Sequence, residues 1–204
     1  MADRIPDYLI KEGPFSKWEL VVRDTFNLKE LYVRLHEFLK DEEFVDLGSG
    51  GDNYETFYYE KDNGDGTTDH KIWWRAARFS KNPAHNNIKF YMQLDMKTVR
   101  MQKKEIIVDG QKQKLDNGEL EFKFYLFIDY RNNKDDTHAF DNHFILKHFK
   151  NLFWNKWNRE PENLAKGEAM AFSNDMYSLI QTYSGVRPQS SNSRRDFVQG
   201  RSWN

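Results

Sequence analysis

The clearest pattern in the chain is an alternation of apolar and mostly polar positions in residues 88–97 and 119–128. The apolar positions are Ile88, Phe90, Met92, Leu94, Met96, Leu120, Phe122, Phe124, Leu126 and Ile128. A period of two is typical of strands that bury one face. Asp109-Gly110 and Asp116-Asn117-Gly118 lie between the two stretches, and such sequences supply the positive φ of tight turns. We therefore expect turns there and an antiparallel meander at the centre of the fold.

A strand and a helix are predicted before this centre. Residues 18–22 form the expected first strand. Asn27 has a side chain that caps a helix, and Glu30, three residues later, completes a capping box. The apolar residues that follow at helical spacing are Leu28, Leu31, Tyr32, Leu35, Phe38 and Leu39. This helix is expected to pack its apolar side on the sheet.

Two loops resemble ligand-binding patterns without matching them. The glycine cluster at 48–51 is followed by a strand-like segment, whereas phosphate-binding loops precede a helix, so we interpret it as a flexible connector. The acidic loop at 61–69 joins the two strands of a predicted hairpin from Tyr54 to Phe79. An EF-hand alignment would put Lys61 and Ile72 where carboxylates are required. The loop is therefore interpreted as an ordinary hairpin connection.

Two helices are expected after the meander. The first spans residues 138–159, with an apolar side formed by Ile145, Leu146, Phe149, Leu152, Phe153 and Trp157. The second has Pro161 in its first turn and ends at Gly185. Its apolar stripe consists of Phe172, Met176, Leu179, Ile180 and Tyr183.

These elements predict an α+β fold, with a curved antiparallel sheet of five to seven strands, one N-terminal helix and two C-terminal helices. We expect a single domain at 1–185 and a basic, flexible arm at 186–204. The arm holds four arginines against Asp196, a net charge of +3. Its apolar residues Phe197, Val198 and Trp203 indicate an arm that docks on its own domain or on a partner.

Composition limits the chemistry. The 204 residues include 32 aromatic side chains and no cysteine, and the net charge is −1. Thiolate catalysis, disulfides, iron–sulfur clusters and Cys-ligated zinc are therefore excluded, and we expect the cytosol. No apolar run approaches the ~20 residues of a membrane-spanning helix. The balanced charge gives no overall attraction for nucleic acid, so any such attraction must be local.

No catalytic motif stands out in the chain. Gly-x-Ser-x-Gly, His-Glu-x-x-His and Walker patterns are absent from the sequence. His138, His143 and His148 are spaced by five, so successive side chains point in different directions from a helix and cannot bind one metal. We predict no metal and no cofactor, and the missing motifs favour a protein without enzymatic activity.

The segment 71–79 is the first candidate binding site, because it carries Trp73, Trp74, Arg75 and Arg78. Alternation puts Trp74 and Arg78 on one face of a strand and Trp73 and Arg75 on the other. An aromatic and cationic surface of this kind can stack bases or sugars. In the plainer alternative, which we favour, one tryptophan is core and the other is covered by a helix or an arginine stem.

Three other surfaces are candidates. The predicted helix at 138–159 has a basic side with Lys147, Lys150 and Trp154, suited to RNA, an anionic lipid surface or an acidic protein. The arm contributes Arg194, Arg195 and Trp203. The middle of the meander holds Lys97, Arg100, Lys103, Lys104, Lys112 and Lys114. These form either a basic hairpin tip or a set of edge lysines that prevent aggregation, and the sequence does not separate the two.

The leading hypothesis is a non-enzymatic binding or assembly protein that uses the aromatic and basic surfaces and the arm to join a protein partner or further copies of itself. The first alternative is an RNA or single-stranded nucleic-acid binding protein. The second is a cup for a small ligand, with or without catalysis.

Overall fold

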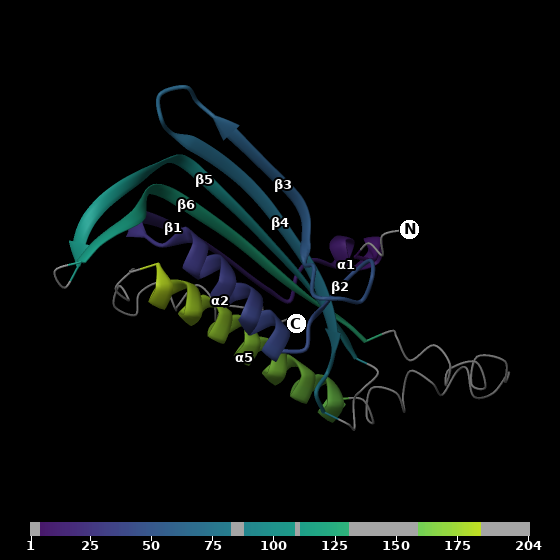
Figure 1. Ribbon diagram of the computed structural model, residues 1–204. Helices are drawn as coiled ribbons and strands as arrows, with labels where there is room; N and C mark the ends of the chain where they lie inside the picture. Colours follow the sequence, from purple (N-terminus) through teal and green to yellow (C-terminus); the bar gives the residue numbers. More distant parts are fainter. Residues whose placement is uncertain (1–4, 83–87, 109–110, 131–158, 185–204) are drawn as a thin grey trace, which may run out of the picture.

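The structure is a computed structural model that describes residues 5–82, 88–108, 111–130 and 159–184. It is an antiparallel sheet of six strands with two long helices on one face (Figure 1). The elements are α1 (Asp7–Glu12), β1 (Ser16–Phe26), α2 (Leu28–Asp41), β2 (Val45–Asp46), β3 (Glu55–Asp62), β4 (Thr68–Phe79), β5 (Lys89–Val108), β6 (Gln111–Asp129) and α5 (Arg159–Tyr183). The predicted α+β class and antiparallel sheet are confirmed.

The first strand pairs with the last one. The sheet order is β1-β6-β5-β4-β2, and β3 pairs with β4 beside the short β2. β1 therefore forms one edge of the sheet, while β2 and β3 share the other. The predicted hairpin of β3 and β4 is confirmed, and β1 is longer at both ends than the predicted strand at 18–22.

One of the two predicted turns is wrong, because Asp116-Asn117-Gly118 lies inside β6. Arg100 and Met101 of β5 both face Gly118, since Val99 pairs with Glu119 and Gln102 with Asn117. Arg100 adopts a φ of 52 in this region, and the two-against-one pairing is a β-bulge. A Cβ on Gly118 would lie 3.1 Å from the Arg100 carbonyl oxygen, so close approach of two backbones requires this glycine.

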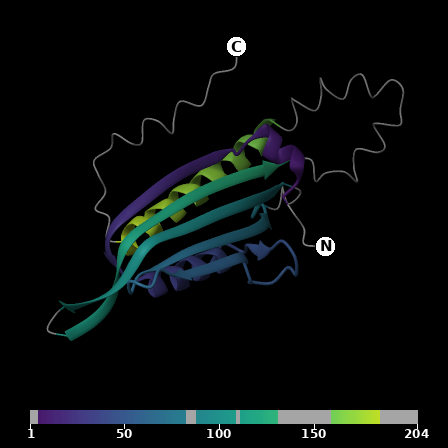
Figure 2. The ribbon, with the colours of Figure 1, turned by 90° about the horizontal axis from the view of Figure 1, so that it is seen from above.

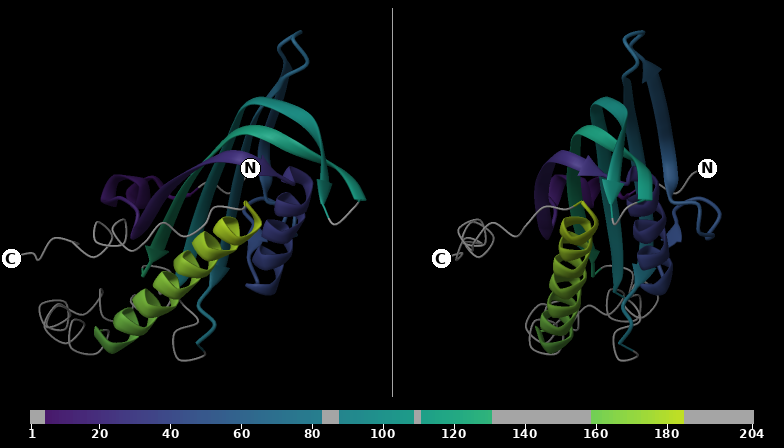
Figure 3. Two further views of the ribbon diagram at one scale, coloured as in Figure 1. Left: turned by 90° about the vertical axis from the view of Figure 1, so that its left-hand side faces the viewer. Right: turned by 60° about the vertical axis from the view of Figure 1, so that its left-hand side comes forward.

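The bulge places the β5–β6 ribbon over the start of α2. Beyond it the paired strands curve toward the helix side of the sheet (Figure 3), as bulged strands commonly do. Asp116 of β6 then accepts a hydrogen bond from the amide of Leu28 at 3.2 Å. Asn27 accepts the amide of Glu30 at 3.1 Å, which confirms the predicted cap. The first turn of α2 is thus capped from its own sequence and from a strand far along the chain.

The main core lies between the inner face of the sheet and the two helices. Figure 2, which looks onto the opposite, outer face, shows both helices behind the sheet. Trp18 of β1 stacks on Phe124 of β6, with ring centroids 4.8 Å apart. Phe172 of α5 stacks on Phe38 of α2 at 5.6 Å. The predicted apolar stripe of α5 is confirmed, and large buried side chains fill the space under the sheet.

A second, smaller core lies on the outer face. The short helix α1, which the sequence pattern did not predict, packs Leu9 there. Leu9 and Ile5 contact Ala77, Tyr91 and Phe127 of the sheet. One end of the outer face is covered in this way, and the part over β3 and the neighbouring half of β4 stays exposed.

Three predictions fall outside the described residues. These are the turn at Asp109-Gly110, the helix at 138–159, except for its last residue, and the arm at 186–204. In the described part of the chain, no helix is both long and apolar enough to cross a membrane.

Candidate functional site: an exposed aromatic surface on the sheet

The two adjacent tryptophans of β4 have opposite environments. Trp74 is on the inner face and only 1% exposed, and it makes an edge contact with Tyr32 of α2 at 4.8 Å. Trp73 is on the outer face and 42% exposed. The expectation that one tryptophan is core therefore holds for Trp74. The expectation that the other is covered does not hold for Trp73.

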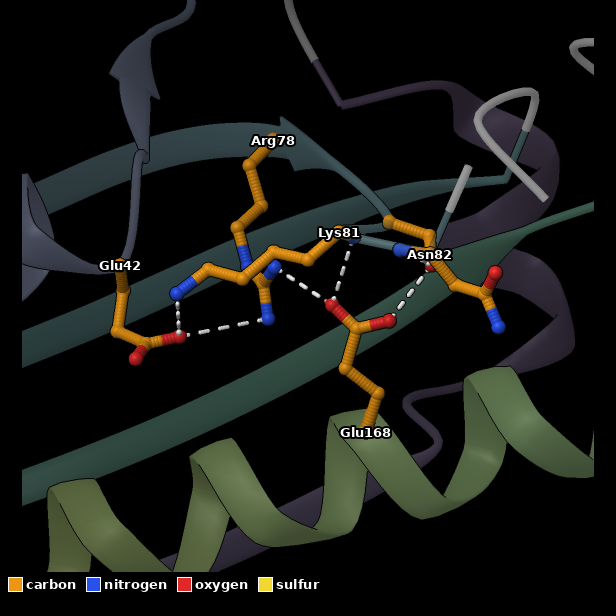
Figure 4. Close-up of polar contacts among 6 residues, drawn as sticks. Glu42, Arg78, Lys81, Asn82 and Glu168 are labelled. Atoms are coloured by element: carbon orange, nitrogen blue, oxygen red, sulfur yellow. Dashed lines mark hydrogen bonds and ion pairs between the residues drawn. The ribbon is translucent and has the colours of Figure 1, made fainter. Parts of the chain in front are cut away.

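Arg78 also faces inward and is almost fully buried. Its Nη1 lies 2.6 Å from Oε1 of Glu168 on α5, and its Nη2 lies 3.5 Å from Oε2 of Glu42 at the end of α2 (Figure 4). The guanidinium lies over the rings of Phe90 at 5.1 Å and Phe44 at 5.2 Å. Both carboxylates and both rings hold this charge inside the core.

Glu168 also binds the residues that follow β4. Its Oε2 accepts the Ser80 hydroxyl at 2.6 Å, and its Oε1 accepts the Lys81 amide at 3.0 Å. The Lys81 ammonium contacts Glu42 at 3.2 Å (Figure 4). This cluster joins the end of β4 to both helices, and its charged groups are paired with one another, although the buried Arg78 Nε has no hydrogen-bond partner among the described residues. Arg78 is therefore a structural residue and not part of an exposed binding surface.

Most of the exposed aromatic side chains of β3 and β4 lie on the outer face, and Tyr58 is the exception, because it lies opposite Ile72 on the inner face. We name Phe57, Tyr59, Trp73 and Arg75 the outer aromatic surface. Phe57 and Trp73 are directly paired across the strands, with ring centroids 4.4 Å apart and planes 32° apart. Phe57 is 38% exposed and Tyr59 is 45% exposed. Together they place three aromatic rings in solvent on two neighbouring strands.

Arg75 is fixed beside Trp73. Its Nη1 lies 2.7 Å from a carboxylate oxygen of Asp95 on β5 and donates to the backbone carbonyl of Trp74 at 2.8 Å. The guanidinium carbon is 5.7 Å from the centre of the Trp73 ring. The arginine is thus positioned before any ligand arrives, and Asp95 balances its charge.

A bulge in β3 brings Phe57 to this surface. The pairing shifts between Glu55, opposite Trp74, and Phe57, opposite Trp73. Glu55 consequently faces inward, where it accepts a hydrogen bond from the Tyr32 hydroxyl at 2.6 Å. Burial, followed by this hydrogen bond, raises the pKa of Tyr32. Without the extra residue, Glu55 and Phe57 would share a face.

Sequence reasoning missed Phe57 and Tyr59 as site residues. The sequence did carry a signal. Residues 57–61 alternate, and in the predicted hairpin they lie opposite residues 69–73, which also alternate. That signal requires the register of the hairpin, and the bulge shifts the register in the middle of the strand.

The charge around the outer aromatic surface is slightly negative. Residues 55–75 contain five carboxylates and three cations, a net charge of −2. Several carboxylates of the hairpin loop accept local hydrogen bonds, as Asp62 does from the Gly64 amide at 2.8 Å and Asp65 from the Thr67 amide at 2.9 Å. Among the described residues, no group of three or more His, Cys, Asp or Glu side chains is arranged to hold a metal ion.

The glycine-rich loop at 48–51 is closed by its own aspartate. The Asp46 carboxylate accepts hydrogen bonds from the amides of Ser49, Gly50 and Gly51. Desolvation opposes the ionised form, but the Ser49 hydroxyl and these amides outweigh it and lower the pKa of Asp46. The amides that a phosphate would need are therefore already engaged, which agrees with a connector and not with a phosphate-binding loop.

The basic residues of the meander are partly neutralised. Lys114 lies 3.7 Å from Glu105 across the ribbon, and Lys97 lies 4.0 Å from Glu121. Lys103 contacts the buried Asp116. These ion pairs lower the net charge of the ribbon, and Lys97, on β5 between β4 and β6, is not an edge lysine.

The remaining predicted site residues lie outside the described part of the chain. They are Lys147, Lys150, Trp154, Arg194, Arg195 and Trp203. Of the predicted residues that the structure describes, it brings Trp73 and Arg75 together on the outer face and separates them from Trp74 and Arg78.

Comparison with known protein families, curated proteins and solved structures found no match. Function must therefore be inferred from the chain's own residues.

Proposed function

We propose that this chain is a non-enzymatic binding and assembly protein that recognises another protein through its outer aromatic surface. The observation that carries the proposal is the joint exposure of Phe57, Tyr59 and Trp73 on neighbouring strands, beside a fixed arginine. Contiguous exposed apolar side chains mark interaction sites in folded proteins. Trp, Tyr and Arg are also the residue types that dominate binding energy at interfaces.

The geometry favours tight recognition at low entropic cost. Trp73 contacts both Phe57 and Arg75, and Arg75 is held by Asp95. Side chains that are already ordered lose little conformational freedom when a partner binds. The surface also lies on the open face of a sheet, which suits contact with another folded protein better than the enclosure of a small ligand.

Charge favours a protein over a nucleic acid. The hairpin that carries the surface has a net charge of −2, and the cation beside Trp73 is paired with Asp95. Nucleic-acid binding relies on several uncompensated cations that contact phosphates. We include the arm at 186–204 in the proposal as a second contact with the partner, on the basis of its arginines and aromatic residues.

Capture of the tagged full-length chain from its native cells tests the proposal. Trp73→Ala is compared with Val21→Ala, because Val21 is 44% exposed on the outer face of β1, at the opposite edge of the same sheet. The expected result is a protein that is enriched with the wild type and with Val21→Ala, and lost with Trp73→Ala. Equal recovery with both variants would contradict the proposal.

The same samples distinguish the nucleic-acid alternative. If nucleic acid copurifies with the wild type, is lost with Trp73→Ala and is removed by raised salt, the partner is a nucleic acid and not a protein. Truncation after Gly185 tests the arm separately, since unchanged recovery of the partner would remove the arm from the proposal.

A further inference from the structure

The strand β3 has a free edge among the described residues, where β4 is its one partner strand. The Asn63 amide bonds the Thr67 carbonyl at 3.0 Å, while the amide of His70 points away from β3 to Thr98 of β5 at 2.8 Å. In an antiparallel pair, every second residue exchanges backbone hydrogen bonds with the partner strand. Counted back from Asn63 in steps of two, Tyr59 is one of the residues that exchange them with β4. The backbone N–H and C=O groups of the two residues beside Tyr59 consequently point away from the sheet.

The protective features of this edge lie at the ends of β3 and not at its centre. Seven of the eight residues of β3 are exposed, and its charges lie at Glu55, beside the bulge, and in Glu60-Lys61-Asp62. Natural edge strands are usually protected by proline, by charges, by bulges or by covering segments. The opposite edge, β1, carries exposed charges at Lys17, Glu19, Arg23 and Asp24. The centre of β3 instead presents three consecutive aromatic residues, between the charged ends of the strand.

We propose that the free edge of β3 pairs with β3 of a second copy of this chain, antiparallel and about a two-fold axis at Tyr59. The inference goes beyond the proposed function, because the contact is made by the backbone edge of β3, and of the outer aromatic surface it involves only Phe57 and Tyr59. An antiparallel pair of identical strands is two-fold symmetric, which is the commonest symmetry of protein oligomers.

The outward backbone groups restrict the register. Only Tyr58, Glu60 and Asp62 can exchange hydrogen bonds across the new edge. Pairing Tyr58 with Asp62 of the second copy would place Glu60 opposite Glu60, where like charges repel. Registers farther along place Asp62 opposite Glu60 or Asp62, with the same repulsion. Pairing Tyr58 with Tyr58 would place Lys61 opposite Glu55 of the second copy. Their side chains would point to different faces of the sheet, because Lys61 faces outward and the bulge turns Glu55 inward, so the two strands would not match there.

The remaining register is self-complementary. Tyr58 pairs with Glu60 of the second copy, and by symmetry Glu60 pairs with Tyr58. On the outer face, Tyr59 lies opposite Tyr59, and Phe57 lies opposite Lys61 of the second copy, a cation beside an aromatic ring. No like charges are directly opposite within the paired strands. The two sheets then continue into one, and the outer aromatic surfaces of both copies become a single surface.

Cross-linking tests this register directly, because the chain has no cysteine of its own. Residues opposite each other in a non-hydrogen-bonded antiparallel pair have Cα atoms about 4.5 Å apart, which lies within the range of a disulfide. We expect Tyr59→Cys to form disulfide-linked dimers at least about tenfold faster than Tyr58→Cys or Val21→Cys under the same mild oxidant, because only position 59 meets itself. Equal rates at the three positions would overturn the proposal.

Sedimentation of the full chain provides the second readout. Glu60→Pro removes one outward N–H without removing a bond to β4, whereas Glu60→Ala keeps that N–H. We expect the wild type and Glu60→Ala to dimerise with rising concentration and Glu60→Pro to dimerise at least about tenfold more weakly. A wild type that stays monomeric at all concentrations, or a Glu60→Pro variant that dimerises as well as Glu60→Ala, would overturn it.

The two proposals fail separately. Trp73→Ala leaves the edge of β3 intact, so it is expected to lose the heterologous partner and still dimerise. Glu60→Pro leaves the exposed Trp73 in place, so it is expected to lose the dimer and keep contact with the partner.

Discussion

Arg78 of β4 and Glu168 of α5 lie 90 positions apart in the sequence, and their side chains meet at 2.6 Å under the sheet. Breaking a buried ion pair leaves an uncompensated charge and typically costs about 3–5 kcal/mol. Glu168→Ala is expected to lower the free energy of unfolding by about 3 kcal/mol, because Glu42 still compensates Arg78 in part. Urea denaturation measures this change.

The matched control for that change is Glu162→Ala on the same helix. Glu162 is paired only loosely with Lys166, at 4.0 Å on the surface. Its removal is expected to change stability by less than about 0.5 kcal/mol. Equal losses for Glu162→Ala and Glu168→Ala would show that the buried cluster does not hold α5 on the sheet.

Asp116 is expected to act as a helix cap from a distant strand, because it accepts the Leu28 amide. Asp116→Ala removes this acceptor and should lower the free energy of unfolding by about 1 kcal/mol, as the loss of a cap typically does. It should also speed hydrogen exchange in the first turn of α2.

The control for this prediction is Glu119→Ala, which removes only an exposed pair with Arg23. Its loss of stability should be below about 0.5 kcal/mol, as is usual for surface ion pairs. Unchanged exchange of the Leu28 amide in Asp116→Ala would contradict the role of Asp116 as a cap.

Two glycines are expected to respond to alanine in opposite directions. A Cβ on Gly118 would lie 2.7 Å from the sulfur of Met101 and 3.1 Å from the Arg100 carbonyl oxygen. Such crowding should destabilise Gly118→Ala by about 1–3 kcal/mol. A Cβ on Gly167 of α5 meets nothing within 4 Å. Gly167→Ala should therefore stabilise the helix by about 0.5–1 kcal/mol. Thermal denaturation compares the two variants, and a shift of the same sign for both would contradict the bulge geometry.

The Tyr58 phenol is expected to titrate late. Burial, followed by the hydrogen bond to Glu60, raises its pKa to about 12. The folded state therefore favours the neutral phenol. The stability that Tyr58 contributes is fully present below about pH 10, the pKa of an unperturbed tyrosine, and it is lost as the pH rises through the pKa of the folded state. The phenolate absorbance of Tyr58→Phe is subtracted from that of the wild type at each pH, and the difference should report the titration of Tyr58 alone. A difference curve with a midpoint near the ordinary value of about 10 would contradict the expectation.

Local sequence signals were sufficient where one segment determines its own structure. Asn27 and Glu30 lie in one turn, so the cap of α2 could be predicted. The alternation in β5 and β6 likewise identified their buried face. The sequence Asp116-Asn117-Gly118 was misleading, because a glycine that opposes a bulge and a glycine in a turn look alike in a sequence.

Long-range pairing is where the sequence was insufficient. Alternation showed that Trp73 and Trp74 face opposite sides, but it could not show which side the helices cover. Phe57 meets Trp73 only through the register of β3 on β4, and that register contains a bulge. Glu42 and Glu168 reach the buried arginine of β4 from two other elements, so no local pattern could connect them.

A photo-crosslinking side chain that keeps an aromatic ring at position 73, introduced into the full-length chain in its native cells, tests the central claim most directly. The same side chain at position 21 of β1 serves as the control, because it is exposed on the same face of the sheet. We expect position 73 to yield one discrete cross-linked protein and position 21 to yield none. Cross-links to the same proteins from both positions, or a cross-link only to nucleic acid from position 73, would contradict a protein partner on the outer aromatic surface.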